Sequence, residues 1–281
     1  MRQILLFILA LIPSSYVWSG VLTGTVMDDD GIGLPYSTIR VTGTKIAILS
    51  DSIGNFALPL NKICDTDSIR ISYIGYETKC ISVRDAIDEQ QLNVRLKMLP
   101  VNLNEIVVHG GRFKRNTIGK KHSWGILKTI LNGQTAGECF GYELHSKKDK
   151  RLILTKVGFF YCEGDSQMTN MKFRINVYDM SAVKKSPSSD FINILPKPIF
   201  FEYVLNDTLT GKFEYKIPEG VVLPKAALVE IEFLEDLGNH IFWFKSNLIG
   251  KKTWSRSLTN GLWEQNPFAS PFFIECLEVD D

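Results

Sequence analysis

The sequence lacks most of the residue patterns on which enzymes and metal sites are built. It has four histidines, His109, His122, His145 and His240, and none is followed three residues later by glutamate, as a zinc carboxypeptidase requires. It also lacks a Cys-x-x-Cys pair, a Gly-x-Ser-x-Gly elbow and a Walker-type phosphate loop. The sequence therefore predicts a protein that is not an enzyme, with no catalytic residue, no metal ion and no cofactor.

Long apolar runs are also scarce. The run from Ile4 to Ile12 follows Arg2 and is too short to span a bilayer. The run is followed by a possible cleavage site that ends in the small residues Ser19 and Gly20. Residues 1–19 are therefore predicted to be a secretory signal peptide, with an uncleaved anchor as the alternative. No lipobox cysteine or later spanning stretch follows. We therefore expect a mature chain without a membrane span, in the periplasm or associated with the outer membrane.

An excess of one charge is missing as well. Thirty-two basic residues against thirty-one acidic ones leave a formal charge of +1, which creates no global field for a polyanion. A glycine-flanked basic stretch at residues 110–121 contains Phe113 and would suggest nucleic acid in an intracellular protein. In an exported chain it indicates a solvated linker, and no nucleic-acid partner is expected.

Cysteines are too few and too widely spread for a disulfide scaffold. A bond between Cys64 and Cys80 is conceivable, but burial of the thiols as small apolar groups is favoured. The five positions are Cys64, Cys80, Cys139, Cys162 and Cys276.

What the sequence does contain is a succession of short β-type runs separated by turn residues. Residues 69–73 and 93–98 alternate apolar and polar side chains, as strands with one buried face do. Only residues 85–91 suggest a helical turn in the first half. We predict an all-β chain with a signal peptide (1–19), a small sandwich (20–108), a linker (109–135) and a larger jelly-roll-like sandwich (136–281).

The first sandwich resembles a known family. The resemblance rests on Gly24-Thr25-Val26-Met27-Asp28, Gly33-Leu34-Pro35, Gly43-Thr44, Gly54-Asn55-Phe56 and Ile71-Ser72-Tyr73-Ile74-Gly75-Tyr76. In order and spacing these residues are similar to the carboxypeptidase regulatory-like domain of exported Bacteroidetes proteins, including TonB-dependent nutrient receptors. The resemblance implies a transthyretin-like fold. Ala47 and Ile48 depart from it, because the family often has Gly-Thr there.

The segment after this module resembles the TonB box of such receptors. It contains Glu105, Ile106, Val107 and Val108, which the resemblance makes candidates for contact with a partner by strand addition. The remaining chain is too short for a plug and a membrane barrel, so an ordinary strand or edge segment is favoured over a TonB contact.

The second half contains nine strand-like runs. The clearest, residues 229–233, alternates with Glu230 and Glu232 on one face. Two carboxylates can build a glycosidase site, but a solvated strand face is favoured. Residues 124–131 could instead be a short helix.

Three residues in this half are candidates for ligand binding. Trp254 and Trp263 lie among polar and turn residues and could hold sugar rings, with packing in the core as the alternative. Arg174 lies mid-strand, where it could line a groove, although a structural salt bridge is favoured. The sequence thus predicts an envelope accessory protein that binds a polysaccharide or peptide. The alternative is a scaffold that contacts an outer-membrane or periplasmic protein, such as a TonB-dependent transport system.

Overall fold

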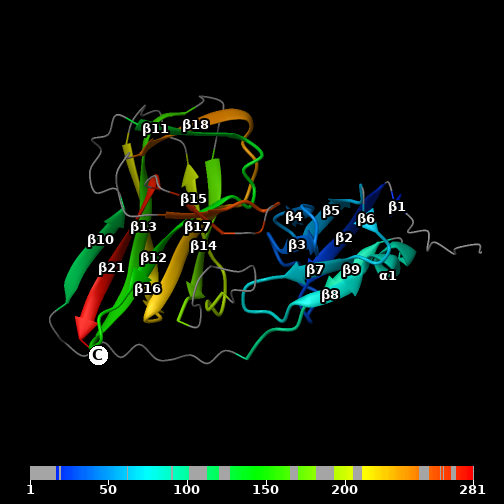
Figure 1. Cartoon of the computed structure of the whole chain (residues 1–281), viewed down its shortest axis with the longest axis horizontal. Coiled ribbons are helices and arrows are strands. Elements are labelled where there is room, and N and C mark those ends of the chain that lie inside the picture. Colours follow the sequence, from blue (N-terminus) through cyan, green and yellow to red (C-terminus); the bar gives the residue numbers. More distant parts are fainter. Residues whose placement is uncertain are drawn as a thin grey trace, which may run out of the picture.

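The chain forms two β-domains that lie side by side, a smaller one and a larger one (Figure 1). The computed structural model describes residues 17–18, 20–61, 63–89, 91–100, 113–119, 127–164, 170–181, 193–204, 211–246, 253–259, 261, 263–266 and 270–280. Strands dominate these residues, which confirms the all-β prediction.

The smaller domain is a sandwich of a three-stranded sheet, ordered β5-β2-β9, and a four-stranded sheet, ordered β4-β3-β7-β8. β2 and β9 run parallel, and β1 pairs with β6 beside the sheets. The elements are β1 (Val17–Trp18), β2 (Val21–Met27), β3 (Thr38–Val41), β4 (Ala47–Leu49), β5 (Asn55–Pro59), β6 (Ile63–Cys64), β7 (Ser68–Ser72), β8 (Lys79–Ser82), α1 (Val83–Asp88) and β9 (Leu92–Arg95).

Strict alternation of side chains explains this sandwich. In β7, Ile69 and Ile71 are fully buried, whereas Arg70 between them and the serines at the two ends of the strand are half-buried. The single helix, α1, begins where the Ser82 hydroxyl accepts a hydrogen bond from the Asp85 backbone amide. The helical turn that the sequence predicts near residues 85–91 is therefore present.

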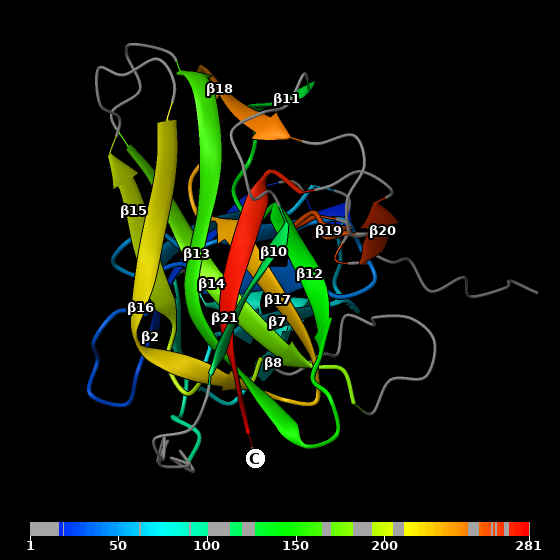
Figure 2. The ribbon, with the colours of Figure 1, turned by 90° about the vertical axis from the view of Figure 1, so that its left-hand side faces the viewer.

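The larger domain consists of two six-stranded antiparallel sheets. One has the order β10-β21-β13-β18-β11, with β16 also paired to β13, and the other has the order β15-β14-β17-β12-β19-β20. Figure 2 shows this domain in front of the smaller one. The strands are β10 (Lys114–Gly119), β11 (Leu127–Gly133), β12 (Cys139–His145), β13 (Lys150–Gly164), β14 (Asn170–Asp179), β15 (Ile199–Val204), β16 (Gly211–Leu223), β17 (Ala226–Phe233), β18 (Gly238–Ser246), β19 (Thr253–Arg256), β20 (Glu264–Asn266) and β21 (Phe272–Asp280).

Aromatic rings fill the space between the two large sheets. The Phe159 ring of β13 lies 5.7 Å from that of Phe173 in β14, and the Phe233 ring of β17 lies 6.0 Å from that of Phe272 in β21, between centroids. Rings at these separations add directional attraction to the burial of apolar area. The predicted sandwich of two sheets is therefore observed.

Two parts of the chain differ from the prediction. Part of the predicted linker (109–135) forms β10 and β11, which pair with β21 and β18 in the larger domain. The alternative of a short helix at residues 124–131 is wrong where the structure describes it, because β11 begins at Leu127. Within the predicted signal peptide, Val17 and Trp18 form β1. The other residues of that segment lie outside the described ones.

Candidate functional site

The outer face of the β14–β17 pair is buried and polar. Glu230 and Glu232 are 0% and 2% exposed, and Arg174 in β14 is 4% exposed. The expectation of a solvated acidic strand face is therefore wrong. The reason is that this sheet faces the smaller domain (Figure 1), where the Arg174 Nη1 atom donates a hydrogen bond of 2.8 Å to the Tyr36 carbonyl.

Arg174 and Glu232 form the buried salt bridge that the sequence favours for Arg174. The Arg174 Nε and Nη2 atoms lie 3.0 and 2.8 Å from Glu232 Oε2. The same oxygen accepts a hydrogen bond of 2.8 Å from the amide of Asn176. A buried carboxylate needs such partners, because an unpaired charge away from water is costly.

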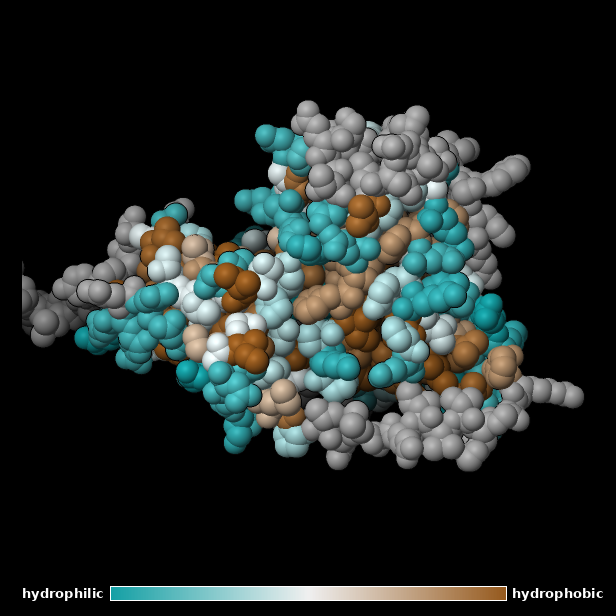
Figure 3. All heavy atoms as spheres, turned by 180° about the vertical axis from the view of Figure 1, so that it is seen from behind, coloured by the Kyte–Doolittle hydropathy of each residue, from teal (hydrophilic) through white to brown (hydrophobic). Residues whose placement is uncertain are grey.

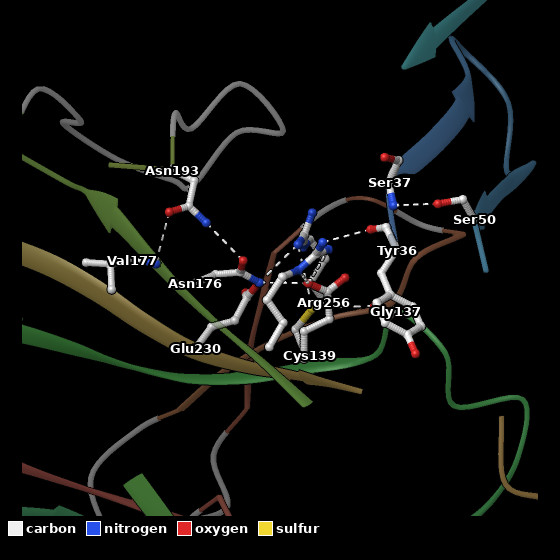
Figure 4. A network of polar contacts seen from close by, with 12 residues as sticks. Tyr36, Ser37, Ser50, Gly137, Cys139, Asn176, Val177, Asn193, Glu230 and Arg256 are labelled. Atoms are coloured by element: carbon white, nitrogen blue, oxygen red, sulfur yellow. Dashed lines mark hydrogen bonds and ion pairs between the residues drawn. The ribbon is translucent and has the colours of Figure 1, made fainter. Parts of the chain in front are cut away.

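Glu230 is held by a second set of donors on the same face (Figure 4). Its Oε1 atom accepts from the Asn176 amide at 2.7 Å, from Arg256 Nη2 at 3.1 Å and from the Tyr178 hydroxyl at 3.2 Å. The Arg256 guanidinium also lies over the Trp263 ring, 4.9 Å from its centroid. The Glu230 Oε2 atom, by contrast, has no hydrogen-bond partner among the described residues.

The two carboxyl groups are perturbed in opposite directions. Burial opposes ionisation of Glu232, but the charges of Arg174 and Arg256 outweigh it, so the pKa of Glu232 is lowered. For Glu230, burial exceeds the attraction of Arg256, and the negative charge of Glu232 adds to it, so its pKa is raised. With two carboxyl and two guanidinium groups, the cluster can balance its own charge.

The same cluster contains three side chains of types that can bind a metal ion, Cys139, Glu230 and Glu232. The Cys139 sulfur and one oxygen each of Glu230 and Glu232 lie within 4.8 Å of one another. Burial raises the pKa of the Cys139 thiol well above its usual range, which opposes the thiolate that a metal needs. A divalent ion would also lie beside two guanidinium groups. This chemistry does not fit a metal site.

Tyr36 is the residue of the smaller domain on which these contacts converge. It adopts a φ of 56°, a left-handed conformation that costs a bulky side chain about 1–2 kcal/mol. The larger domain surrounds it with three contacts. Its carbonyl accepts from Arg174, its hydroxyl donates to Glu235 Oε1 at 2.9 Å, and its ring packs edge-on against Phe200 at 5.7 Å. Tyr36 therefore couples the backbone of one domain to the other.

Two further contacts join the domains. The Arg40 guanidinium donates to the carbonyl oxygens of Leu258 and Thr259. Gly75, at a φ of 81°, lies so close to the other domain that a Cβ atom there would be 2.1 Å from the Pro196 carbonyl oxygen. The domains thus meet through polar groups and close backbone contact, in addition to the Tyr36–Phe200 ring contact.

A groove of about 890 Å³ opens beside this contact. Its size lies in the range of ligand sites. On the smaller domain it is lined by Tyr36 and residues 47–52 and 55–57. On the larger domain it is lined by Gln134, Ala136, Glu138 and residues 234–236 and 257–259.

The predicted ligand-binding tryptophans lie close to the buried cluster. Trp263 is 6% exposed and packs with Tyr178 and Leu228, so its ring is not an open platform. Trp254 is half-buried, and its Nε1 atom donates to Glu143 Oε2 at 3.2 Å. The candidate partner segment of Glu105, Ile106, Val107 and Val108 lies outside the described residues.

No disulfide bond joins the five cysteines, all of which lie in the described part of the chain. Cys139, Cys162 and Cys276 are buried, as expected for thiols used as small apolar groups. Cys80 is exposed and Cys64 is half-buried, so burial is the wrong expectation for Cys80, and the conceivable bond between these two is not formed.

Exposed apolar residues are distributed over both domains. They include Val21, Ile32 and Ile53 in the smaller domain and Val204 and Ile241 in the larger one. From behind, hydrophobic residues reach the surface of both domains, with hydrophilic residues around them (Figure 3). Individual residues of this kind are normal on folded proteins and do not define a site.

Most of the cluster was not predicted as a functional set. The sequence singled out Arg174 but not Asn176, Tyr178 or Arg256. The sequence does contain a pattern that could have indicated the cluster. Arg174, Asn176 and Tyr178 occupy every second position of β14, and Glu230 and Glu232 do the same in β17. Complementary polar faces on two runs can indicate a shared buried contact.

Comparison with known proteins identifies the class of the smaller domain. Residues 22–108 match the CarboxypepD_reg-like domain family, so this part of the chain is a carboxypeptidase regulatory-like domain. This family is non-catalytic. Over 117 residues the chain is 32% identical to the TonB-dependent receptor P39 of Formosa agariphila. The match covers 40% of this chain and 11% of the receptor.

Two solved structures with which the chain aligns show remote likeness to it. The cysteine protease and lectin-like domains of Cwp84, a surface layer associated protein of Clostridium difficile, align over 84% of this chain and 46% of theirs, with a TM-score of 0.34 and 11% identity. The infectious bursal disease virus Gx strain aligns over 96% of this chain and 66% of its own, with a TM-score of 0.29 and 10% identity. Likeness at this level carries no argument about function.

Proposed function

We propose that this chain is a non-enzymatic accessory or assembly protein of the bacterial cell envelope that acts by holding a protein partner. One observation carries the proposal. Glu230 and Glu232 are paired with guanidinium groups within the contact between the domains. Carboxyl groups that are buried and paired in this way are not open to a substrate, which favours a structural role for them.

The shared regulatory-like module supports an envelope setting. The chain resembles a TonB-dependent receptor over that region. The apolar run before it is predicted to be part of a signal peptide. None of the helices in the described ranges is long and apolar enough to cross a membrane. The proposed location is the periplasm or the periplasmic side of the outer membrane, and the proposed partner is an outer-membrane or periplasmic protein.

Recognition of a polysaccharide is less well supported than recognition of a protein. Sugar rings stack on exposed aromatic faces, whereas the Trp263 ring is buried under Arg256. The Trp254 side chain is engaged with Glu143. A peptide or protein partner is therefore the form of binding that we propose.

Cross-linking in intact cells tests this function. The full-length chain with an affinity tag is expressed in the organism that encodes it, treated with a lysine-reactive cross-linker and purified under denaturing conditions. We expect mass spectrometry to identify an envelope protein that is enriched over a tagged, unrelated exported protein.

A polysaccharide assay provides the opposing test. The purified chain is passed over immobilised polysaccharides together with its Trp254→Ala and Trp263→Ala variants. Retention of the wild type that is lost in a folded variant would overturn the proposal in favour of glycan binding. The absence of any enriched envelope protein after cross-linking would also overturn it.

A further inference from the structure

β4 forms one wall of the groove and is an edge strand. It pairs with β3 alone, as the first strand of its sheet. Val41 donates to the Ile46 carbonyl and Ser50 donates to the Ser37 carbonyl, so the even-numbered positions of this segment bond to β3. The backbone groups of the odd-numbered positions, Ala47 and Leu49, therefore point away from β3.

These outward groups can accept a further strand. Ala47 and Leu49 each offer one N–H donor and one carbonyl acceptor, and no partner for them is found among the described residues. Both residues line the groove. An extended peptide in the groove could pair with them, as in other proteins that bind peptides by adding a strand to a sheet edge.

The negative charge of the groove favours extended peptides that carry a positive charge. Its described lining includes Asp51, Glu138, Glu235 and Asp236 but no lysine, arginine or histidine. Lys172 pairs with Glu235 at 2.9 Å and offsets one of these charges. The remaining wall is negative, so a cationic side chain complements it.

Glu138 is the acidic residue best placed to receive a cation. It is half-buried, and its carboxyl group has no hydrogen-bond or ion-pair partner in the described part of the chain. Burial raises the pKa of Glu138. A positive charge beside it would compensate for lost hydration. By contrast, Asp51 accepts backbone hydrogen bonds from Ile53 and Asn55 in its own turn.

We propose that this groove binds an extended segment of an envelope protein that carries a lysine or arginine and pairs as an added strand with β4. This inference rests on the proposed function, since it names the chemistry of the partner. Main-chain hydrogen bonds to Ala47 and Leu49 hold the segment, apolar side chains such as Phe56 and Leu258 contact it, and Glu138 receives the cation.

A peptide library measures this preference directly. The probes are pools of capped, fluorescent octapeptides with one residue fixed at one position and the others varied, and binding to the full-length chain is followed by fluorescence anisotropy. We expect pools with a fixed lysine or arginine to bind about tenfold more tightly than pools with glutamate at the same position.

Matched variants assign that binding to the groove. Leu49→Pro removes an outward N–H that β3 does not use, whereas Leu49→Thr changes the same side chain and keeps the N–H. Glu138→Gln removes the unpartnered charge, with exposed Glu89→Gln as its control. We expect about tenfold weaker binding for Leu49→Pro and Glu138→Gln and unchanged binding for the controls, in variants with wild-type circular dichroism and melting.

Several outcomes would overturn this inference. They are equal binding of the lysine and glutamate pools, equal binding of Leu49→Pro and Leu49→Thr, or a groove that instead retains a neutral oligosaccharide or Ca²⁺. Cross-linking in cells separates the two proposals. If Leu49→Pro keeps the envelope partner of the wild type, the groove assignment fails and the proposed function stands. If the wild type has no such partner, the proposed function fails.

Discussion

Glu230 and Glu232 share one donor, the side-chain amide of Asn176, which lies 2.7 Å from an oxygen of the first and 2.8 Å from an oxygen of the second. They are two positions apart on one face of β17 and yet differ in the sign of their pKa shift. The difference follows from Arg174, which directs two donors at Glu232 and its third at Tyr36.

The two carboxyl groups should therefore respond differently to neutralisation. Glu232→Gln leaves the Arg174 charge buried without its partner, and we expect a loss of about 3 kcal/mol in the free energy of unfolding. Glu230→Gln removes a charge whose ionisation is opposed, so it should cost less than about 1 kcal/mol. Urea denaturation at pH 7 measures both. Equal losses would contradict the asymmetry.

The dependence of stability on pH should separate them again. Because the folded pKa of Glu232 is lowered, its contribution is present above its unfolded pKa of roughly 4.3 and is lost as the pH falls through the folded pKa. The difference between wild type and Glu232→Gln should thus shrink below about pH 4. Denaturation between pH 3 and 7 (roughly the span of both titrations) checks this. A constant difference would show that charge does not cause the loss.

For Glu230 the sign is reversed. Its folded pKa is raised, so stability associated with the protonated form is lost as the pH rises through that pKa. Glu230→Gln should therefore gain stability relative to wild type between about pH 4 and pH 7. The same denaturation series measures it, and a relative loss over that interval would contradict the assignment.

Gly75 tests the contact between the domains. Gly75→Ala combines a left-handed backbone with a Cβ atom 2.1 Å from the Pro196 oxygen. Gly43→Ala is the matched control, because Gly43 has a φ of 77° and nothing lies within 4 Å of its added Cβ. The control should lose about 1–2 kcal/mol, and Gly75→Ala should lose more and shift the domains apart.

Small-angle scattering and thermal melting check that prediction. A larger radius of gyration in Gly75→Ala than in Gly43→Ala is the expected result. Identical scattering and melting of the two variants would mean that the contact at Pro196 contributes nothing beyond backbone strain.

The thiols offer a test that needs no mutation. Cys80 is exposed, so a maleimide should modify it rapidly in the native protein, with half-buried Cys64 following more slowly. Cys139, Cys162 and Cys276 are buried and should react only after unfolding. Peptide mapping after timed labelling identifies the order. Early modification of Cys139 would contradict its burial in the contact between the domains.

The sequence was informative where structure depends on local pattern. Ile69 and Ile71 alternate with polar residues, and that pattern alone predicts a strand with one buried face. The order of glycines and apolar residues from Gly24 to Tyr76 was specific enough to predict the regulatory-like domain.

The local sequence pattern did not predict burial or strand pairing where these depend on a segment distant in the sequence. Alternation places Glu230 and Glu232 on one face of β17, but it does not reveal that another domain covers that face. Similarly, the basic stretch that contains residues 114–119 predicts a linker, but these residues pair with β21, far away in the sequence. The groove was missed for the same reason, because its two walls come from different domains.

The polar character of the contact between the domains has a consequence for assembly. Among the described residues the two domains have separate apolar cores, and Ile74 of the smaller domain packs into the core of the larger. The surfaces around Tyr36 and Arg174 can be hydrated before they meet. Docking therefore exchanges water at Arg174, Arg256 and their partners for contacts within the protein, and it also buries Ile74.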